Sequence, residues 1–392
     1  MPLQKKINNR RVLRIAGAFI AWMIGSGFAT GQEILQFFSS YGYLSYGVLL
    51  FNLVLFVAIG RMLFATGYDH KEPDFDHFRY YCGERLGKVY SWLVPVTLIM
   101  LVAVMISAAG STMHEYFDIP RQLGSTVMAI AVVGAYLAGF DKIVGIVSSI
   151  GPVIILFALL VGAVTILKDI GNVGGIEQYR DTLASSSASP NWILSAFSYA
   201  SMCLFTAGTY FTALGQSAVT KEEARIGATI GGVAFIIVLA IMNTALLLNA
   251  GQITGQEIPT LYLAARISRL LAGFFSGVLI LGMFSTCSTM MWSAASRFFK
   301  DDAGKNRTFA IALGIIILIA GQFPFSRLLG IFYPLVGYAG LIYLGCVVWK
   351  NITNRRASVT QDPSVLPGQE ILTTEEHSVL SEAEGSPLIV RE

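Results

Sequence analysis

Long apolar runs separated by short polar segments dominate the chain. A helix needs about 20 mainly apolar residues to cross a bilayer, and ten runs reach or approach that length. They lie at 12–40, 43–66, 90–113, 123–137, 143–167, 192–216, 227–248, 270–292, 308–322 and 325–348. The pattern therefore predicts an all-α polytopic membrane protein with about ten transmembrane helices.

The spacing of these runs repeats. Helices six to ten begin 180 to 185 residues after helices one to five. Because each half holds five helices, the second half enters the membrane from the opposite face, which is an inverted repeat. We predict a first five-helix repeat at 12–167, an extracellular loop at 168–191 and a second repeat at 192–349.

The basic residues orient this arrangement. Of 27 Lys and Arg residues, 21 fall on the side of the membrane that holds both termini, and only six on the other. By the positive-inside rule, both termini are cytoplasmic. We therefore predict a multi-pass plasma membrane protein with a cytoplasmic segment at 1–11 and a cytoplasmic tail at 350–392. The tail is rich in Glu, Ser and Thr, and we expect it to be disordered.

Composition and motifs exclude several classes of function. Hydrophobic residues make up 54% and charged residues only 13% of the chain, against about 25% charged residues in a soluble domain. The net charge of +3 comes from short loops, so no nucleic-acid partner is expected. No HExxH, GxSxG or P-loop occurs. We expect no enzyme and no cofactor, and the predicted partners are the bilayer and a small solute.

One polar segment between the runs contains several metal-binding residue types. It spans 67–89 and contains Asp69, His70, Asp74, Asp76 and His77. Their spacing matches no defined metal motif. We interpret the segment as a solvated cytoplasmic loop.

The first apolar run is interrupted by Gly25-Ser26-Gly27. Glycine forms helices poorly, and backbone groups left unpaired within a bilayer need another partner. Close helix packing is one explanation. Flanking polar residues, and an irregular stretch around Gly208, 183 residues after Gly25, favour a binding site instead. We predict that helices one and six are discontinuous. The candidate substrate-binding residues are Gly25, Ser26, Gly27, Thr30, Glu33, Phe205, Thr206 and Gly208.

Such a break has its own chemistry. The outer half-helix would begin near Ser26 and present free N–H groups, which suit a carboxylate. The inner half-helix would end near Ile24 and present free carbonyls, which suit Na⁺ or an ammonium group.

Met23-Ile24-Gly25-Ser26-Gly27-Phe28 resembles the first-helix motif of the amino acid–polyamine–organocation (APC) superfamily, and the layout is similar to its LeuT-type fold. The segment 24–33 most resembles the YkvI family of proposed amino acid permeases. The resemblance implies transport of amino acids or related amines by alternating access.

The eighth run contains Ser285, Ser288 and Thr289 on one helical face. Resemblance to sodium-coupled LeuT-type carriers implies a Na⁺ site in this region, with ligands from the hydroxyls of Ser288 and Thr289 and the carbonyls of Ser285, Ala21 and Ile24. Hydroxyl groups that bond back to their own helix are the alternative. Proton-coupled relatives carry a lysine within helix five, but here Lys142 and Lys168 stand at its ends, which favours Na⁺.

Glu33 has two interpretations. It stands six residues beyond Gly27, roughly 9 Å along a straight helix. An acidic residue within a membrane helix indicates function: amine binding, proton coupling or an outer gate. A position near the outer water interface is the alternative.

The sequence as a whole predicts a secondary active transporter of a small amino acid or amine, coupled to Na⁺. Two alternatives stay open: an H⁺-coupled carrier, and a membrane receptor that senses a small ligand without net transport.

Overall fold

The computed structural model describes residues 7–72, 74–138, 150–295 and 303–360. Within those ranges every regular element is a helix. The chain divides into two units, residues 1–348 and residues 349–392. In the second unit, the part of the chain that the structure describes is the end of helix α16.

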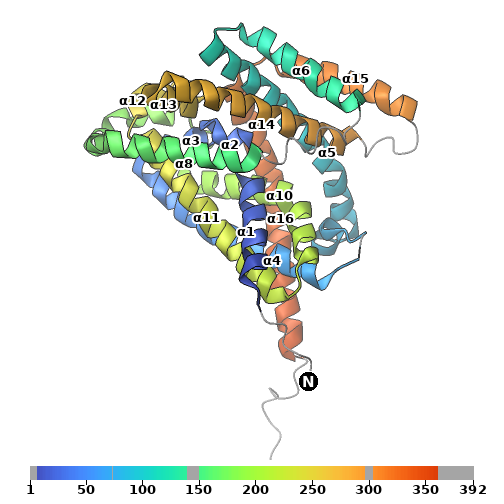
Figure 1. The fold of residues 1–392 in the computed structure, drawn as a ribbon. Helices are drawn as coiled ribbons and strands as arrows, with labels where there is room; N and C mark the ends of the chain where they lie inside the picture. Colours follow the sequence, from blue (N-terminus) through green and yellow to red (C-terminus); the bar gives the residue numbers. More distant parts are fainter. Residues whose placement is uncertain (1–6, 73, 139–149, 296–302, 361–392) are drawn as a thin grey trace, which may run out of the picture. The chain divides into compact units, whose positions relative to one another are not determined.

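The helices follow one another with short connections (Figure 1). In chain order they are α1 (Asn9–Met23), α2 (Ser26–Ala29), α3 (Gln32–Phe37), η1 (Ser39–Leu44), α4 (Ser45–Asp69), α5 (His77–Phe117), α6 (Arg121–Ala138), α8 (Ile150–Asp169), η3 (Ile170–Gly175), η4 (Glu177–Tyr179), α9 (Arg180–Ala184), α10 (Trp192–Ser217), α11 (Lys221–Leu247), α12 (Ala250–Ile253), α13 (Pro259–Ile267), α14 (Arg269–Ala295), α15 (Ala303–Ala320) and α16 (Phe325–Thr360).

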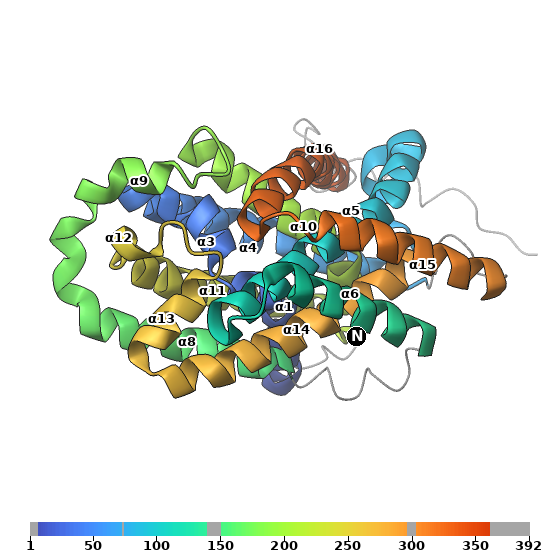
Figure 2. The ribbon, with the colours of Figure 1, turned by 90° about the horizontal axis from the view of Figure 1, so that it is seen from above.

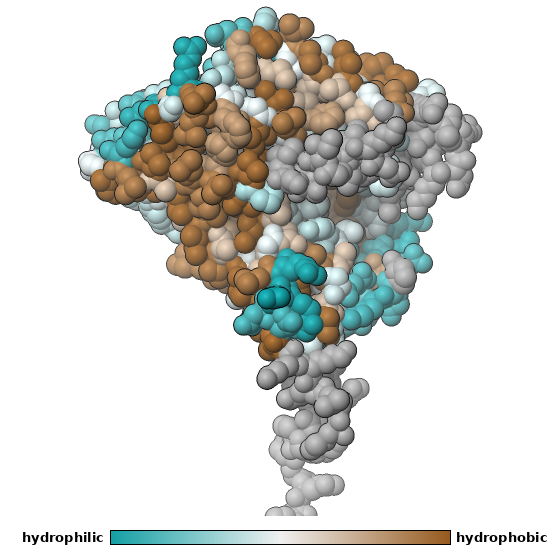
Figure 3. All heavy atoms as spheres, in the orientation of Figure 1, coloured by the Kyte–Doolittle hydropathy of each residue, from teal (hydrophilic) through white to brown (hydrophobic). Residues whose placement is uncertain are grey.

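Six of the described helical segments are long and apolar enough to cross a membrane. They are Ser39–Asp69, His77–Phe117, Gly151–Gly175, Lys221–Leu247, Arg269–Ala294 and Phe325–Asn354, with shorter apolar helices at Arg121–Leu137 and Thr308–Ala320. Large apolar side chains on α8 and α11, among them Leu156, Leu160, Ile230 and Ile237, are exposed and contribute to a broad apolar surface (Figure 3). The prediction of an all-α polytopic membrane protein is confirmed.

Helices from the two halves pack together in two groups (Figure 2). In the first, α4 packs against α10 and α11, and α1 packs against α11. In the second, α5, α6, α14 and α15 pack against one another. The first group is filled by aromatic side chains, with Phe19 stacked on Phe211 at 4.4 Å between ring centroids.

The predicted interruption of the first helix is present, and it is followed by a second one. Helix α1 ends at Met23, and Gly25 is extended at φ −84°, ψ −178°. Helix α2 is a single turn, and Gly31 then adopts φ +80° before α3 begins. A left-handed conformation of this kind favours glycine. The first predicted helix is therefore three short helices joined at Gly25 and Gly31.

The predicted interruption of helix six is wrong. Helix α10 runs from Trp192 to Ser217 as one helix. Its Thr206 and Thr212 hydroxyls bond back to carbonyls three or four residues earlier, so they leave the helix intact. Gly208 serves close packing, because a Cβ there would lie 2.8 Å from His77 Cε1 and 3.1 Å from the Tyr343 hydroxyl.

The segment 67–89 is mostly helical, which corrects its interpretation as a loop. Helix α4 continues to Asp69, and α5 starts at His77, where the Asp76 side chain accepts bonds from the N–H groups of Phe78 and Arg79. His77 is buried and bonded to Tyr343 and Thr209. The described residues contain no cluster of three or more His, Cys, Asp or Glu side chains that could hold a metal ion.

The ends of the predicted segments are partly described. Helix α8 begins at Ile150, and the earlier part of predicted helix five lies outside the described residues. The connection 168–191 contains η3, η4 and α9. Helix α16 continues to Thr360, so the start of the predicted tail is helical, and residues 361–392 lie outside the described part.

Candidate functional site

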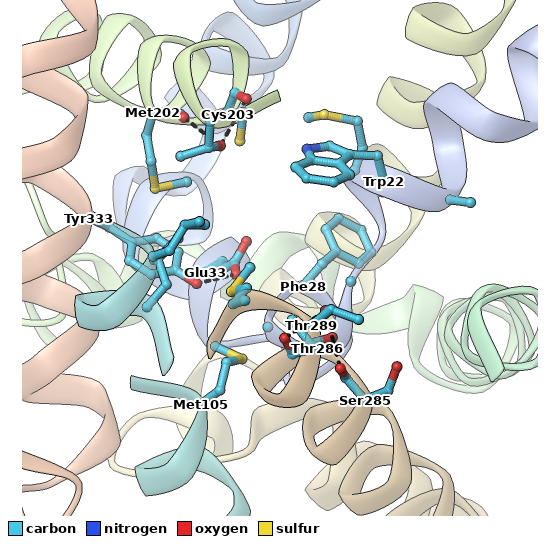
Figure 4. Close-up of a pocket in the computed structure, with 18 of the residues that line it drawn as sticks. Trp22, Phe28, Glu33, Met105, Met202, Cys203, Ser285, Thr286, Thr289 and Tyr333 are labelled. Carbon is cyan, nitrogen blue, oxygen red and sulfur yellow. Dashed lines mark hydrogen bonds between the residues drawn. The ribbon is translucent and has the colours of Figure 1, made fainter. Parts of the chain in front are cut away.

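A cavity of about 350 Å³ lies where the broken first helix meets α5, α10, α14 and α16 (Figure 4). The described residues that line it are Ala21, Trp22, Met23, Gly25, Gly27, Phe28, Glu33, Leu98, Leu101, Met105, Met202, Cys203, Thr206, Ser285, Thr286, Thr289, Met290, Ser293 and Tyr333. Both predicted halves contribute, so the cavity has the composition expected of a central binding site in an inverted-repeat fold.

Glu33 belongs to the wall of this cavity. Its side chain is 7% exposed, and Oε1 accepts a 2.8 Å hydrogen bond from the Tyr333 hydroxyl. The same oxygen occupies the space that a Cβ on Gly27 would need. The turn at Gly31 brings the carboxyl group back towards α2, so the straight-helix separation from Gly27 is wrong, and the carboxyl group is buried within the protein.

Of the candidate residues on the first helix, some line the cavity and others do not. Gly25 and Gly27 line the cavity. Thr30 is fully buried and closes α2 instead, since its hydroxyl donates to the Gly27 carbonyl at 2.6 Å and accepts from the N–H of Gln32. Ser26 begins α2, and its side chain lies outside the described part of the structure.

Of the predicted residues on helix six, the cavity wall includes Thr206. Phe205 is buried elsewhere, in an aromatic cluster with Phe78 and Tyr90 whose ring centroids lie 5.6 and 5.4 Å away. Gly208 packs on His77 and Tyr343, as described above. Neither residue is among the described lining residues, because the continuous helix turns them towards the α5 and α16 side.

The predicted sodium ligands are only partly gathered at the cavity. Ala21, Ser285 and Thr289 line it, together with two further α14 hydroxyls, Thr286 and Ser293. The Ser288 hydroxyl bonds to the Phe284 carbonyl at 2.7 Å, and the Thr289 hydroxyl bonds to the carbonyls of Thr286 and Ser285. Ile24 is buried, and its N–H donates to the Ile20 carbonyl.

The rest of the wall is largely apolar, and two aromatic side chains border the first break. Trp22 stacks on Tyr210 with 4.7 Å between ring centroids, and Phe28 packs near Phe235. Three helices add the methionines Met105, Met202 and Met290. Tyr333 carries no sequence signal that separates it from the other membrane tyrosines, since only its contact with Glu33 reveals it.

The charge of the wall is one-sided. Among the described lining residues, Glu33 is the only Asp, Glu, Lys, Arg or His. A carboxyl group in a largely apolar wall needs a partner, because an uncompensated buried charge is costly.

No protein-family model matches the chain. It is 23% identical over 351 residues to the uncharacterized membrane protein YkvI of Bacillus subtilis (strain 168), covering 88% of this chain and 97% of that protein. It is 24% identical over 339 residues to YyaD of the same organism, covering 85% and 95% of the two chains.

Among solved structures, it is similar to MhsT in complex with L-phenylalanine. The TM-score is 0.54 at 15% identity, and the match covers 86% of each chain. These comparisons agree with the resemblance to YkvI-type proteins and to the LeuT-type fold. The chain is thus similar to YkvI and YyaD over most of its length, and it has the fold of LeuT-type transporters.

Proposed function

We propose that the protein is a secondary active transporter of a small amino acid or a related amine, working by alternating access in the plasma membrane with both termini in the cytoplasm. The observation that carries the proposal is the broken first helix, whose Gly25 and Gly27 face a 350 Å³ cavity shared by both halves. MhsT, which has a similar fold, was solved with L-phenylalanine. A cavity of this size lies in the range of small-molecule sites.

Sodium is the coupling ion that we favour. Three of the five predicted ligands, Ala21, Ser285 and Thr289, border the same cavity, so an ion there would lie close to the substrate. Hard cations prefer oxygen ligands. The described part of helix five, α8, carries its lysine at the end, at Lys168, away from the position that proton-coupled relatives use. Proton coupling through Glu33 is the competing mechanism.

The other candidate function is ligand sensing without net transport. The same cavity would serve a receptor, so the two functions differ only in whether the ligand crosses the membrane.

The test is uptake by the purified full-length protein in proteoliposomes. A panel of radiolabelled amino acids and amines, first narrowed by thermal-shift screening, is offered with an inward Na⁺ gradient, an inward H⁺ gradient or neither. Accumulation driven by Na⁺ supports the proposal. Accumulation driven only by H⁺ would show that the coupling ion is H⁺ and not Na⁺. Binding without accumulation in any gradient favours the receptor.

A further inference from the structure

The charged side chains in the cavity wall bear on whether the ligand is an amine or an amino acid. An α-amino acid brings a carboxylate and an ammonium group on one carbon, so its site must satisfy both charges. The described wall of the cavity offers one carboxyl group, at Glu33, and no Lys, Arg or His. A positive ligand group therefore has a partner in the wall, whereas a negative group has no side chain of opposite charge there and would depend on the proposed Na⁺.

The turn at Gly25–Gly27 is the place where a ligand carboxylate would be expected to bind, and Glu33 already lies against it. Its Oε1 fills the space that a Cβ on Gly27 would need, and it accepts the hydrogen bond from the Tyr333 hydroxyl. A ligand carboxylate laid on Gly27 would meet this oxygen. Two carboxylates that share one buried site repel each other strongly.

The rest of the wall suits the hydrocarbon part of a ligand. Trp22 and Tyr333 lie on opposite sides of the cavity in Figure 4, with Phe28 next to Trp22 and Met105 lower in the view. Methionine side chains adapt to apolar groups of different shapes, and aromatic faces attract organic cations. These contacts favour an aliphatic or aromatic body next to a single positive head group.

We propose that the cavity binds a primary organic amine without a neighbouring carboxylate, with its ammonium group paired with the Glu33 carboxylate and its apolar body against Trp22, Phe28 and the methionines. This proposal rests on the proposed function, and it narrows the substrate class. The ammonium group neutralises the carboxylate within the bilayer, and Tyr333 orients Glu33 for that contact through its hydrogen bond.

Matched ligands test the proposal with the purified full-length protein by isothermal titration calorimetry. The first set is 2-phenylethylamine, L-phenylalanine and 3-phenylpropionate, which share one ring and differ in their charged groups. The second set is 3-methylbutylamine, L-leucine and 4-methylpentanoate. We expect an amine to bind about 100-fold more tightly than its amino acid, the ratio expected from one unmatched buried charge, and the carboxylates not to bind.

Variants locate the binding. Glu33→Gln should weaken amine binding about 100-fold, whereas Glu177→Gln, the same substitution at an exposed site outside the cavity, should leave it unchanged. If Glu33→Gln does not fold, the ligand series on the unaltered protein decides alone. Binding of an amino acid as tight as that of its amine, binding of a carboxylate, or no binding of either amine would overturn the proposal.

The uptake assay separates this result from the proposed function. Gradient-driven accumulation of amino acids but not of amines supports the proposed transport function and contradicts the amine substrate class. Tight amine binding without accumulation in any gradient supports an amine as the ligand and contradicts the proposed transport function.

Discussion

The hydroxyl of Tyr333 donates a 2.8 Å hydrogen bond to Oε1 of Glu33, although the two residues stand 300 positions apart in the sequence. Both side chains are buried, at 4% and 7% exposure. The contact joins α3 in the first half to α16 in the second, directly beside the cavity.

Removing this donor should destabilise the protein. We expect Tyr333→Phe to lower the free energy of unfolding by about 1–3 kcal/mol, because a buried acceptor loses its partner. Thermal unfolding without ligand measures the effect, and Tyr338→Phe, at an exposed tyrosine of the same helix, is the matched control. Equal melting temperatures for the two variants would show that the bond contributes nothing.

Gly27→Leu should abolish ligand binding while the protein still inserts and folds. A Cβ at this position would displace Glu33 Oε1, and it would lie 3.1 Å from both Met105 Cε and the Tyr333 hydroxyl, so a larger side chain fills the cavity. Calorimetry and size-exclusion chromatography report the two properties. The control is Gly17→Ala in α1, where a Cβ has no neighbour within 4 Å and binding should not change. Unchanged affinity in Gly27→Leu would place the ligand elsewhere.

Gly208→Ala should affect stability rather than binding. The added methyl group would press on His77 and Tyr343, and overpacking of this kind costs about 1–3 kcal/mol. Gly345→Ala, which meets nothing within 4 Å, should be neutral or stabilising, as expected for alanine in a helix. A loss of ligand affinity in Gly208→Ala without a loss of stability would return Gly208 to the binding site.

The sodium site is tested on two neighbouring hydroxyls of α14. The double variant Ser288→Ala with Thr289→Ala should remove the sodium dependence of uptake. Since Thr289 lines the cavity and the Ser288 hydroxyl bonds to Phe284, Thr289→Ala alone should raise the half-saturating Na⁺ concentration more than Ser288→Ala does, by about 10-fold or more. Unaltered sodium dependence in the double variant would eliminate the site.

The sequence was sufficient for the helical class, most of the membrane helices and the first break. These depend on local properties: the length of apolar runs and the poor helix formation of Gly25 and Gly27. The position of the Glu33 carboxyl group could not be predicted from the sequence. A straight helix would carry Glu33 away from Gly27, but the left-handed conformation of Gly31 turns the chain before α3.

Gly208 shows a second limit. A glycine between threonines favours a break or a close contact equally well, and the choice depends on which side chains pack against it. Here His77 and Tyr343, distant in sequence, occupy the adjacent space, and α10 stays continuous. Tyr333 was missed for the same reason, since its role is defined by a partner in the other half.

In each predicted half, one residue bonds to the first helix of the other half. His77 of the first half bonds to Thr209 of α10 at 3.0 Å, and the N–H of Thr260 in the second half bonds to the Thr30 carbonyl at 3.1 Å. Thr260 follows His77 by 183 residues, the same interval that separates Gly208 from Gly25.

The helices that begin the two predicted halves differ in continuity. Helix α10 is one helix over its whole length, whereas the first helix is interrupted at Gly25 and Gly31. Sharp kinks form at glycines and at other breaks in the helical backbone. We therefore expect a change of shape around the ligand to be taken up at these two glycines, while α10 moves as one piece.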